Sequence, residues 1–325
     1  MESHNNSHKG GSAHNYFNLT ISYMRRFLFI LIFSGLTLLP SQGSNQDWKQ
    51  TVLTEKLQEL YQTGQWQKAL SYIDSLKTAG IRFDIIAIEA ECYAGLGDYT
   101  TAIELVEKEI KTGPIEKRHY QYQTLGNIYH LKKEYKTSIK NYKKAIELRP
   151  SYARPYISIA ETYELLGEEQ KSIEHYLNAV DLFIQNEFYN EAIEYSSRVL
   201  AIDSQNIDAL TYLQYGLHLT QRYEDALSVG MRLHHLSQDL DPQSIMLTGM
   251  SAYHCKEYEL SISLISSAIQ NKDISKEDAW IGLSYVSAIC YLKGDEESAK
   301  QFEKVASDSG TDASSFIKRL IDANK

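Results

Sequence analysis

The chain has 325 residues, of which 43% are hydrophobic, and it carries a net charge of −9 at neutral pH. This hydrophobic content is typical of a folded protein and excludes a disordered chain. The excess of acidic residues disfavours binding to nucleic acid or to anionic membrane surfaces. The three cysteines lie far apart and give no support for a disulfide framework.

Residues 1–43 have the layout of a secretory signal peptide. Two arginines precede an apolar run over residues 27–39, and small residues suited to a cleavage site follow it. The run is shorter than the ~20 residues that a membrane-spanning helix needs. Met24 stands directly before the arginines and is a candidate for the true start. We expect export to the periplasm or cell envelope, with no direct membrane binding after the leader is removed; anchoring by an uncleaved leader is the alternative.

Eight small residues recur along the rest of the chain. Subtraction of their positions gives steps of 33 to 38 residues, with a single step of 20. They are Ala69, Ala102, Ser138, Ser172, Ala192, Ala226, Ser261 and Ala299. Three positions earlier there is usually Trp or Tyr, and five positions earlier half of the units have a glycine that fits a turn with positive φ. This pattern predicts a turn followed by a helix that crosses its partner closely at the small residue.

A period of this length is typical of solenoids built from helical hairpins. The third unit carries the clearest motif, formed by Tyr122, Leu125, Gly126, Tyr129, Ser138, Tyr142, Ala145 and Pro150. The fourth unit follows with Tyr156, Ile159, Ala160, Tyr163, Gly167, Ser172, Tyr176 and Ala179. The chain therefore resembles the tetratricopeptide repeat family, with about eight units over residues 48–308. The resemblance implies an all-α, right-handed superhelical solenoid of antiparallel helix pairs, with a concave groove that binds a segment of another protein.

The step from Ser172 to Ala192 is too short for a whole helical hairpin. We expect residues 170–185 either to act as the second helix of one unit and the first of the next, or to form an irregular longer helix. The superhelix is expected to bend or to shift its register near Asn186.

Residues 311–325 are predicted to form a helix that caps the last unit. Asp312 and Ser314 are candidates for its N-cap. Its apolar stripe consists of Phe316, Ile317, Leu320 and Ile321. No effector domain is predicted after the repeats.

The sequence contains none of the motifs that identify a metal site, a phosphate-binding loop or a nucleophilic catalytic centre. The acidic cluster Glu161, Glu164, Glu168 and Glu169 is interpreted as a surface run, and no partner motif supports a role as paired catalytic acids. We therefore predict no catalytic residues, no cofactor, no bound metal and no enzymatic activity.

The resemblance implies which positions of each unit's first helix face the groove. These are the second, fifth, ninth and twelfth positions, and carried over to this chain they give Tyr120, Gln123, Asn127, His130, Arg154, Glu161, Glu164, Tyr215, His218, Met246, Met250 and Tyr253. Asn127 is expected to bond a partner's backbone amide, and Arg154 to bind a carboxylate. The two methionines are expected to adapt to apolar side chains. For each tyrosine, packing between adjacent units is an equally weighted alternative.

Some members of this family grip a C-terminal carboxylate with a basic and amide clamp. Gln123 stands where such a clamp has Lys, and Ser158 stands where it has an amide. Binding of chaperone tails is therefore not expected.

Two functions are consistent with these features. The first is a non-enzymatic scaffold that binds a peptide segment or a client protein in its groove, in the cell envelope. The alternative is a sensory or regulatory peptide-binding module of a signalling pathway, and a spacer without a ligand is a third possibility. The absence of a predicted effector domain favours the scaffold.

Overall fold

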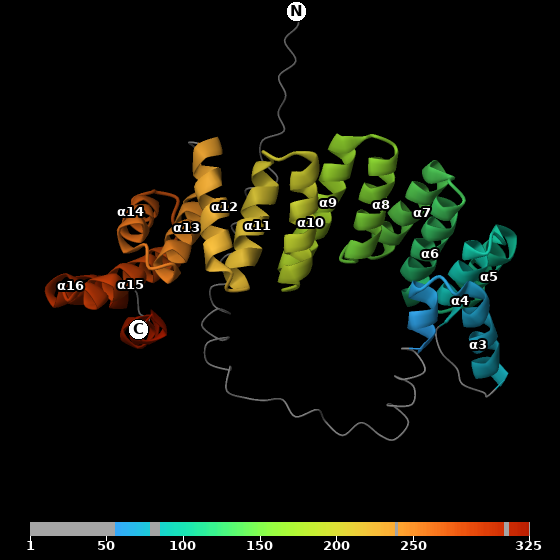
Figure 1. Cartoon of the computed structure of the whole chain (residues 1–325), viewed down its shortest axis with the longest axis horizontal. Coiled ribbons are helices and arrows are strands. Elements are labelled where there is room, and N and C mark those ends of the chain that lie inside the picture. Colours follow the sequence, from blue (N-terminus) through green and yellow to red (C-terminus); the bar gives the residue numbers. More distant parts are fainter. Residues whose placement is uncertain (1–55, 79–84, 238–239, 309–311, 325) are drawn as a thin grey trace, which may run out of the picture.

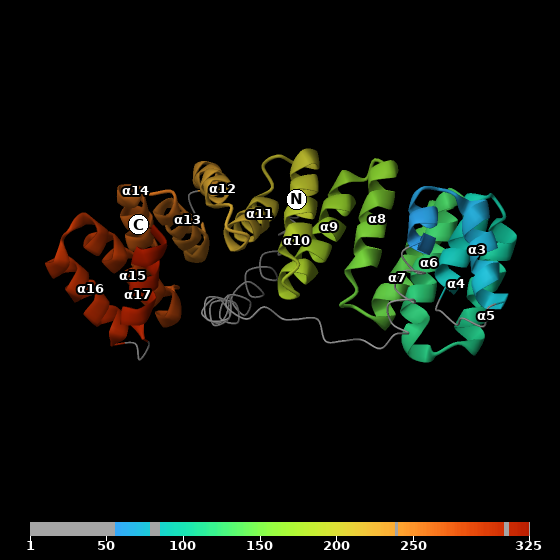
Figure 2. The same ribbon diagram turned by 60° about the horizontal axis from the view of Figure 1, so that its bottom comes forward.

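The computed structural model describes residues 56–78, 85–237, 240–308 and 312–324. These residues form helices joined by short turns, and no strand occurs among them. The expected leader at residues 1–43 lies outside the described residues. The helices stack side by side in chain order (Figures 1 and 2), which confirms the all-α solenoid of antiparallel helix pairs.

A short helix over residues 56–62 begins the described part. The elements that follow are α3 (Trp66–Thr78), α4 (Ile86–Gly95), α5 (Tyr99–Thr112), η1 (Ile115–Lys117), α6 (Arg118–Leu131), α7 (Tyr135–Leu148), α8 (Ala153–Leu165), α9 (Glu169–Gln185), α10 (Tyr189–Ile202), α11 (Ile207–Leu219), α12 (Tyr223–Leu236), α13 (Pro242–His254), α14 (Tyr258–Ile269), α15 (Lys276–Lys293), α16 (Glu296–Ser307) and α17 (Ala313–Asn324). Each α-helix packs against the one before it and the one after it, so that successive helices alternate between two layers. None of the described helices has the length and apolar character needed to cross a membrane.

The eight recurring small residues all lie at helix crossings, and each is 0% exposed. In the third unit the Ser138 hydroxyl donates to the Gly126 carbonyl oxygen at 2.8 Å, which ties α7 directly to the backbone of α6. A Cβ atom on Gly126 would lie 2.2 Å from the ring of Tyr142. The close crossing therefore depends on small residues on both helices, as the repeat pattern predicted.

The predicted left-handed turn occurs five residues before every one of the small residues. Four of these positions carry glycine: Gly64, Gly97, Gly167 and Gly294, with φ between 67° and 88°. The other four carry ordinary residues in the same conformation: Lys133, Glu187, Gln221 and Lys256, with φ between 62° and 66°. The hairpin geometry therefore imposes this backbone conformation even where the sequence has no glycine to mark it.

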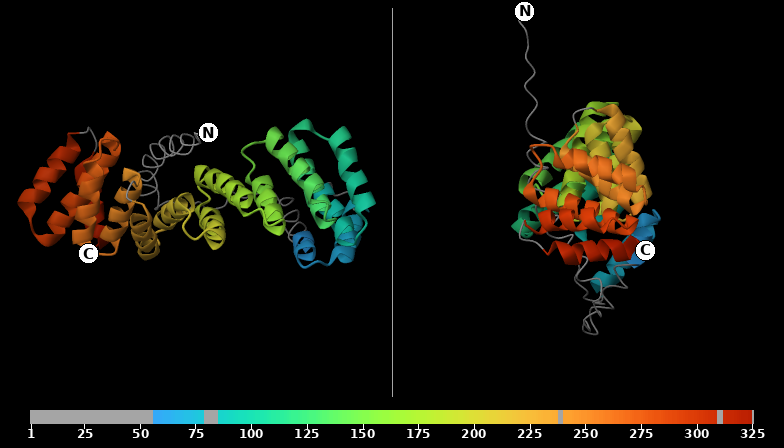
Figure 3. Two further views of the ribbon diagram at one scale, coloured as in Figure 1. Left: turned by 90° about the horizontal axis from the view of Figure 1, so that it is seen from above. Right: turned by 90° about the vertical axis from the view of Figure 1, so that its left-hand side faces the viewer.

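The single helix α9 replaces a helix pair in the middle of the stack. It has 17 residues and packs against both α8 and α10. Among alternate helices, α4, α6 and α8 approach one another before this point, and α9, α11, α13 and α15 approach one another after it. Alternate helices meet on the inner side of a curved two-layer stack, because that side is the shorter. The inner side therefore passes from one layer to the other at α9, along the curved path that Figure 3 shows from above.

Helix α17 ends the described chain. Asp312 caps it, because its carboxylate accepts a hydrogen bond from the Ser315 backbone N–H at 3.2 Å. Phe316, Ile317 and Leu320 are buried in one hydrophobic cluster with residues of α13 and α15.

Candidate functional site

The candidate site is the inner side of α4, α6 and α8. We call the side chains of Glu91, Asn127, Arg154, Glu161 and Glu164 the N-terminal inner face. Glu91 was missed by the sequence analysis, although it occupies in α4 the position that Asn127 occupies in α6 and Glu161 in α8. Counting the groove positions of the second unit in the same way as those of the third and fourth units identifies Glu91.

Glu91 connects three units of the stack. Its carboxylate accepts a hydrogen bond from the Asn127 side-chain amide at 2.6 Å and another from the Tyr61 hydroxyl. Loss of hydration raises the pKa of Glu91, and these two donors together with the Arg154 charge oppose that shift. The side-chain amide of Asn127 is therefore already engaged inside the protein.

The oxygen of the Asn127 side chain is engaged as well. It accepts hydrogen bonds from the Gln123 amide at 3.0 Å and from the Tyr142 hydroxyl at 2.9 Å. The Gln123 amide also donates to the Ser158 hydroxyl at 2.9 Å, which joins α6 to α8. Gln123 is only 5% exposed, so the expectation that it faces a partner is wrong. Gln123 and Ser158, which stand at the positions of the carboxylate clamp, are therefore hydrogen-bonded to each other.

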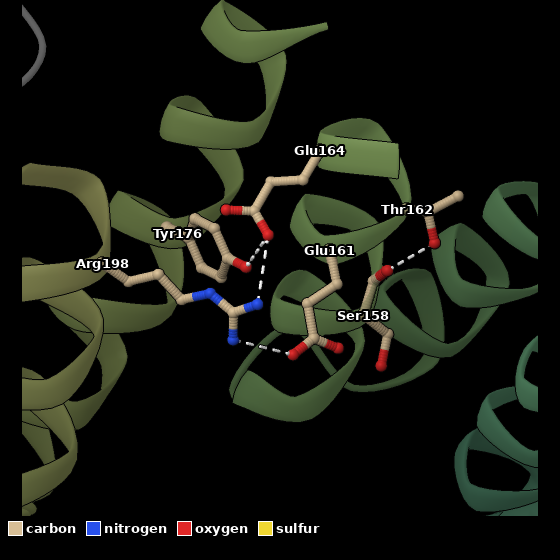
Figure 4. A network of polar contacts seen from close by, with 6 residues as sticks. All are labelled: Ser158, Glu161, Thr162, Glu164, Tyr176 and Arg198. Carbon is tan, nitrogen blue, oxygen red and sulfur yellow. Dashed lines mark hydrogen bonds and ion pairs between the residues drawn. The ribbon is translucent and has the colours of Figure 1, made fainter. Parts of the chain in front are cut away.

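Glu161 and Glu164 are joined by Arg198, which reaches them from α10 (Figure 4). The guanidinium donates to Glu161 at 3.2 Å and to Glu164 at 3.1 Å. It also lies 5.3 Å from the centre of the Tyr176 ring, and the Tyr176 hydroxyl donates to Glu164 at 3.1 Å. Both carboxylates are partly exposed, as expected for a surface cluster, but the ion pairs with Arg198 were not predicted, because this partner lies more than 30 residues away in the sequence.

Arg154 differs from its neighbours on this face. It is exposed at the start of α8, and its guanidinium makes no hydrogen bond or ion pair within the described residues. It lies close enough to Glu91 and to Tyr195 to influence the pKa of both groups. Arg154 is therefore an exposed cation on the inner face.

Aromatic side chains adjoin Arg154 at the same end of α6 and α8. Tyr120 is 41% exposed, and its ring centre lies 5.3 Å from that of Tyr152 and 3.9 Å from that of His119. Arg149 donates to the Tyr120 hydroxyl at 3.2 Å. Tyr120 is thus held in place and still exposed.

Other predicted groove residues serve contacts between units. The His130 ring is half-buried, and its Nδ1 lies 3.0 Å from the Thr162 hydroxyl of α8. His218 is 1% exposed, and its Nδ1 lies 2.8 Å from the Ser251 hydroxyl of α13. Tyr215 is half-buried, with its ring centre 6.5 Å from that of Tyr189. These three side chains join neighbouring helices.

Met246, Met250 and Tyr253 are core residues in the structure. Their exposed fractions are 1%, 4% and 0%, and they belong to the hydrophobic cluster that includes α15 and α17. The expectation that they line an open groove is wrong, because these two helices cover them.

Two histidines of the second half, the buried His218 and the half-buried His254, lie close together. Burial lowers the pKa of His218 to about 3 and that of His254 to about 4, so both rings are neutral at physiological pH. The His254 ring stacks on Tyr223, with 3.9 Å between centres and 11° between planes. Within the described ranges, no group of three or more His, Cys, Asp or Glu side chains is placed to hold a metal ion.

With this geometry established, comparison with known families identifies one segment. Residues 126–167 match the family described as "TPR repeat". This match supports the tetratricopeptide repeat family. The matched segment runs from within α6 to the turn after α8, and so contains most of the N-terminal inner face. Comparison with curated proteins finds no match.

Comparison with solved structures finds matches of low sequence identity, each with a TM-score under 0.5. The APC/C hetero-tetramer Cut9-Hcn1 is 14% identical over 86% of this chain, with a TM-score of 0.37, and the match spans 57% of the length of that chain. YrrB, described as a TPR protein with an unusual peptide-binding site, is 18% identical over 63% of this chain and 92% of its own, with a TM-score of 0.36. PilF of Pseudomonas aeruginosa is 14% identical, and the match covers 62% of this chain and 96% of PilF, with a TM-score of 0.37. The matched repeat and the solenoid fold together support a protein-interaction scaffold of the tetratricopeptide type.

Proposed function

We propose that this protein is a non-enzymatic scaffold that binds a segment of another protein along the N-terminal inner face. One observation carries the proposal. Arg154 is an exposed cation that makes no hydrogen bond or ion pair within the part of the chain that the structure describes, on a face where the other charged and amide side chains are bonded to one another.

The bonded side chains make this face rigid before a partner arrives. Glu91 and Asn127 are fixed across three units, and Arg198 fixes Glu161 and Glu164. A surface whose side chains are already ordered loses little conformational entropy on binding. A partner therefore meets a fixed charge pattern rather than a mobile one.

The charges on α8 suggest the chemistry of the bound segment. Arg154 presents a guanidinium suited to a carboxylate. Glu161 and Glu164 share the single cation of Arg198, which leaves net negative charge near the other end of the helix. Arg154 and Glu161 are seven positions apart, about 10 Å along an α-helix, which an extended segment spans in about three residues. The bound segment is thus expected to carry an acidic residue and a basic residue about three positions apart.

We further propose that binding takes place in the cell envelope. The signal-peptide layout of residues 1–43 supports this location. Fractionation of cells that produce the full chain tests it, and recovery of the protein in the cytoplasm with its leader intact would contradict it.

A peptide-display selection tests the binding proposal. The full chain, an Arg154→Glu variant and a Lys140→Glu variant are each used to select peptides from a random library. Lys140 is a matched control, because it is an exposed cation on α7, in the outer layer of this half. We expect the native chain and the Lys140→Glu variant to enrich an acidic position, and the Arg154→Glu variant to replace it with a basic one. The same enrichment with all three proteins would refute the proposed site.

A further inference from the structure

The path of α17 is unlike that of the other helices in the stack. Near its first turn, the Ser314 hydroxyl donates to Glu303 of α16. Further along, the Phe316 ring lies against α15, with 5.6 Å between its centre and that of Trp280. Figure 2 shows α17 beside α15 at the red end of the stack.

The C-terminal half of α17 reaches α13. The Tyr253 hydroxyl of α13 donates to the Leu320 carbonyl oxygen at 2.8 Å. The Asn324 side-chain amide donates back to the Tyr253 carbonyl oxygen at 3.2 Å. Helix α17 therefore extends from α16, across α15, to α13, whereas a further solenoid helix would rest on α15 and α16 alone.

This path places α17 over the inner side of the second half. Four side chains at groove positions of α13 and α15 form what we call the C-terminal inner face: Met250, Tyr253, Ile281 and Ala288. Their exposed fractions are 4%, 0%, 5% and 0%. On the N-terminal inner face, by contrast, Arg154 is exposed and Asn127 is half-buried. One inner face is open and polar, and the other is apolar and covered by a helix.

We infer that the C-terminal inner face is a binding surface for an amphipathic helix, that α17 is its resident in cis, and that a partner helix with the same apolar pattern exchanges with α17. The pattern is set by Phe316, Ile317 and Leu320, at relative positions 1, 2 and 5, which form one apolar stripe on a helix. The same stripe on a partner would bury the same surface.

The size of α17 makes such exchange feasible. The helix has 12 residues, and a helix of this length is marginal when it is isolated in water. Its attachment to the same chain gives it an effective concentration on the order of millimolar. A partner helix displaces it when the ratio of partner concentration to partner Kd exceeds the same ratio for α17. The cis helix therefore sets a threshold that excludes weak partners from this surface.

The test uses the full chain and a labelled peptide with the native sequence of residues 312–324. A Phe316→Ser/Leu320→Ser variant removes two of the three apolar side chains that set the stripe of α17, and it changes no residue of the C-terminal inner face. A Lys318→Ser variant is the matched control, because Lys318 is exposed on the same helix. We expect the double variant to bind the peptide at least about tenfold more tightly than the native chain or the control, since it has lost its cis competitor. Equal binding by all three proteins, or none by a double variant whose helical circular dichroism is retained, would overturn the inference.

Hydrogen exchange on the native chain gives a second measurement if the double variant does not fold. We expect the amides of α17 to exchange faster than those of α15, through local release of the helix. Exchange of both helices at one common rate would show that α17 leaves its site only on global unfolding, and the inference would fail.

Discussion

The side-chain amide of Asn127 in α6 donates to the carboxylate of Glu91 in α4 across 2.6 Å. The same kind of contact recurs between successive units, from Gln123 to Ser158 and, in the second half, between His218 and Ser251. Polar residues at the inner positions therefore hold neighbouring units together. A partner meets the side chains of this face that stay exposed, of which Arg154 is the clearest.

Replacement of Asn127 by Ala tests how much these contacts stabilise the stack. The substitution removes a donor to a partly buried carboxylate and leaves Glu91 with the Tyr61 hydroxyl alone. We expect the free energy of unfolding to fall by about 1–3 kcal/mol, because an enclosed charge that loses a hydrogen bond retains its desolvation cost. Urea denaturation measures the change. Arg154→Ala is the control, and it is expected to stay within about 0.5 kcal/mol of the native value, because Arg154 is exposed. Equal midpoints for the two variants would contradict this account.

The four turns without glycine allow a test in which a substitution is expected to raise stability. Lys133 and Lys256 have φ of 63° and 64°, in the left-handed region that costs an L-residue about 1–2 kcal/mol. Glycine removes that strain but loses more backbone entropy on folding. Lys133→Gly and Lys256→Gly are therefore each expected to raise stability by about 0.5–1 kcal/mol, seen as a higher melting temperature.

The neighbouring residue serves as control for this prediction. Lys132 has φ of −71° at the end of α6, where glycine relieves no strain, so Lys132→Gly is expected to lower the melting temperature. If Lys132→Gly and Lys133→Gly shift it in the same direction, strain at the left-handed position is not the cause.

These turns also show what the sequence could reveal and what it could not. The eight small residues are all buried where two helices cross, because only small side chains fit there, so these close crossings could be predicted from the sequence. Glycine marked only half of the left-handed turns. At Lys133 and its three counterparts, tertiary packing imposes a conformation that the local residue does not favour, so no local signal exists.

The candidate site was less predictable than the fold. Position counting placed Asn127, Arg154 and Glu161 on one face, because that placement follows from the helical repeat alone. It could not show that Arg198 pairs with Glu161, because this contact depends on how the single helix α9 places α10 relative to α8. Nor could it show that Met250 is covered, because the path of a terminal helix is set by tertiary contacts and not by the repeat.

Arg198 provides a test of the ion pairs on α8. An Arg198→Met substitution keeps most of the side-chain length but removes the contacts with Glu161 and Glu164. Because these side chains are partly exposed, we expect a loss of about 0.5–1 kcal/mol at low ionic strength and less in about 1 M salt, where the charges are screened. Urea denaturation at the two ionic strengths measures both values. In the control, Arg222→Met, an exposed pair between the N-cap residue of α12 and Asp225 in its first turn is lost, and the change is expected to be about 0.5 kcal/mol or less. A salt-independent loss in Arg198→Met would instead point to packing on Tyr176.

The buried histidines predict how stability depends on pH. In the unfolded chain a histidine has a pKa near 6.5. In the folded chain burial lowers the pKa of His218 to about 3 and the pKa of His254 to about 4. Between these values the unfolded chain binds protons that the folded chain does not, so stability is lost as the pH falls below about 6.5. Each histidine contributes a slope of at most about 1.4 kcal/mol per pH unit in this window and none above it.

A single variant isolates this contribution from that of the acidic groups. Glu91, whose pKa is raised, acts in the opposite direction, since the folded form takes up its proton more readily. His218→Gln removes one titrating ring but retains polar atoms near the Ser251 hydroxyl. The stability of the native chain relative to this variant is therefore expected to decline steadily from pH 6 to pH 4, and to be constant from pH 7 to pH 8. Urea denaturation at each pH measures the difference, and parallel profiles of the two proteins would show that His218 is not held neutral by the fold.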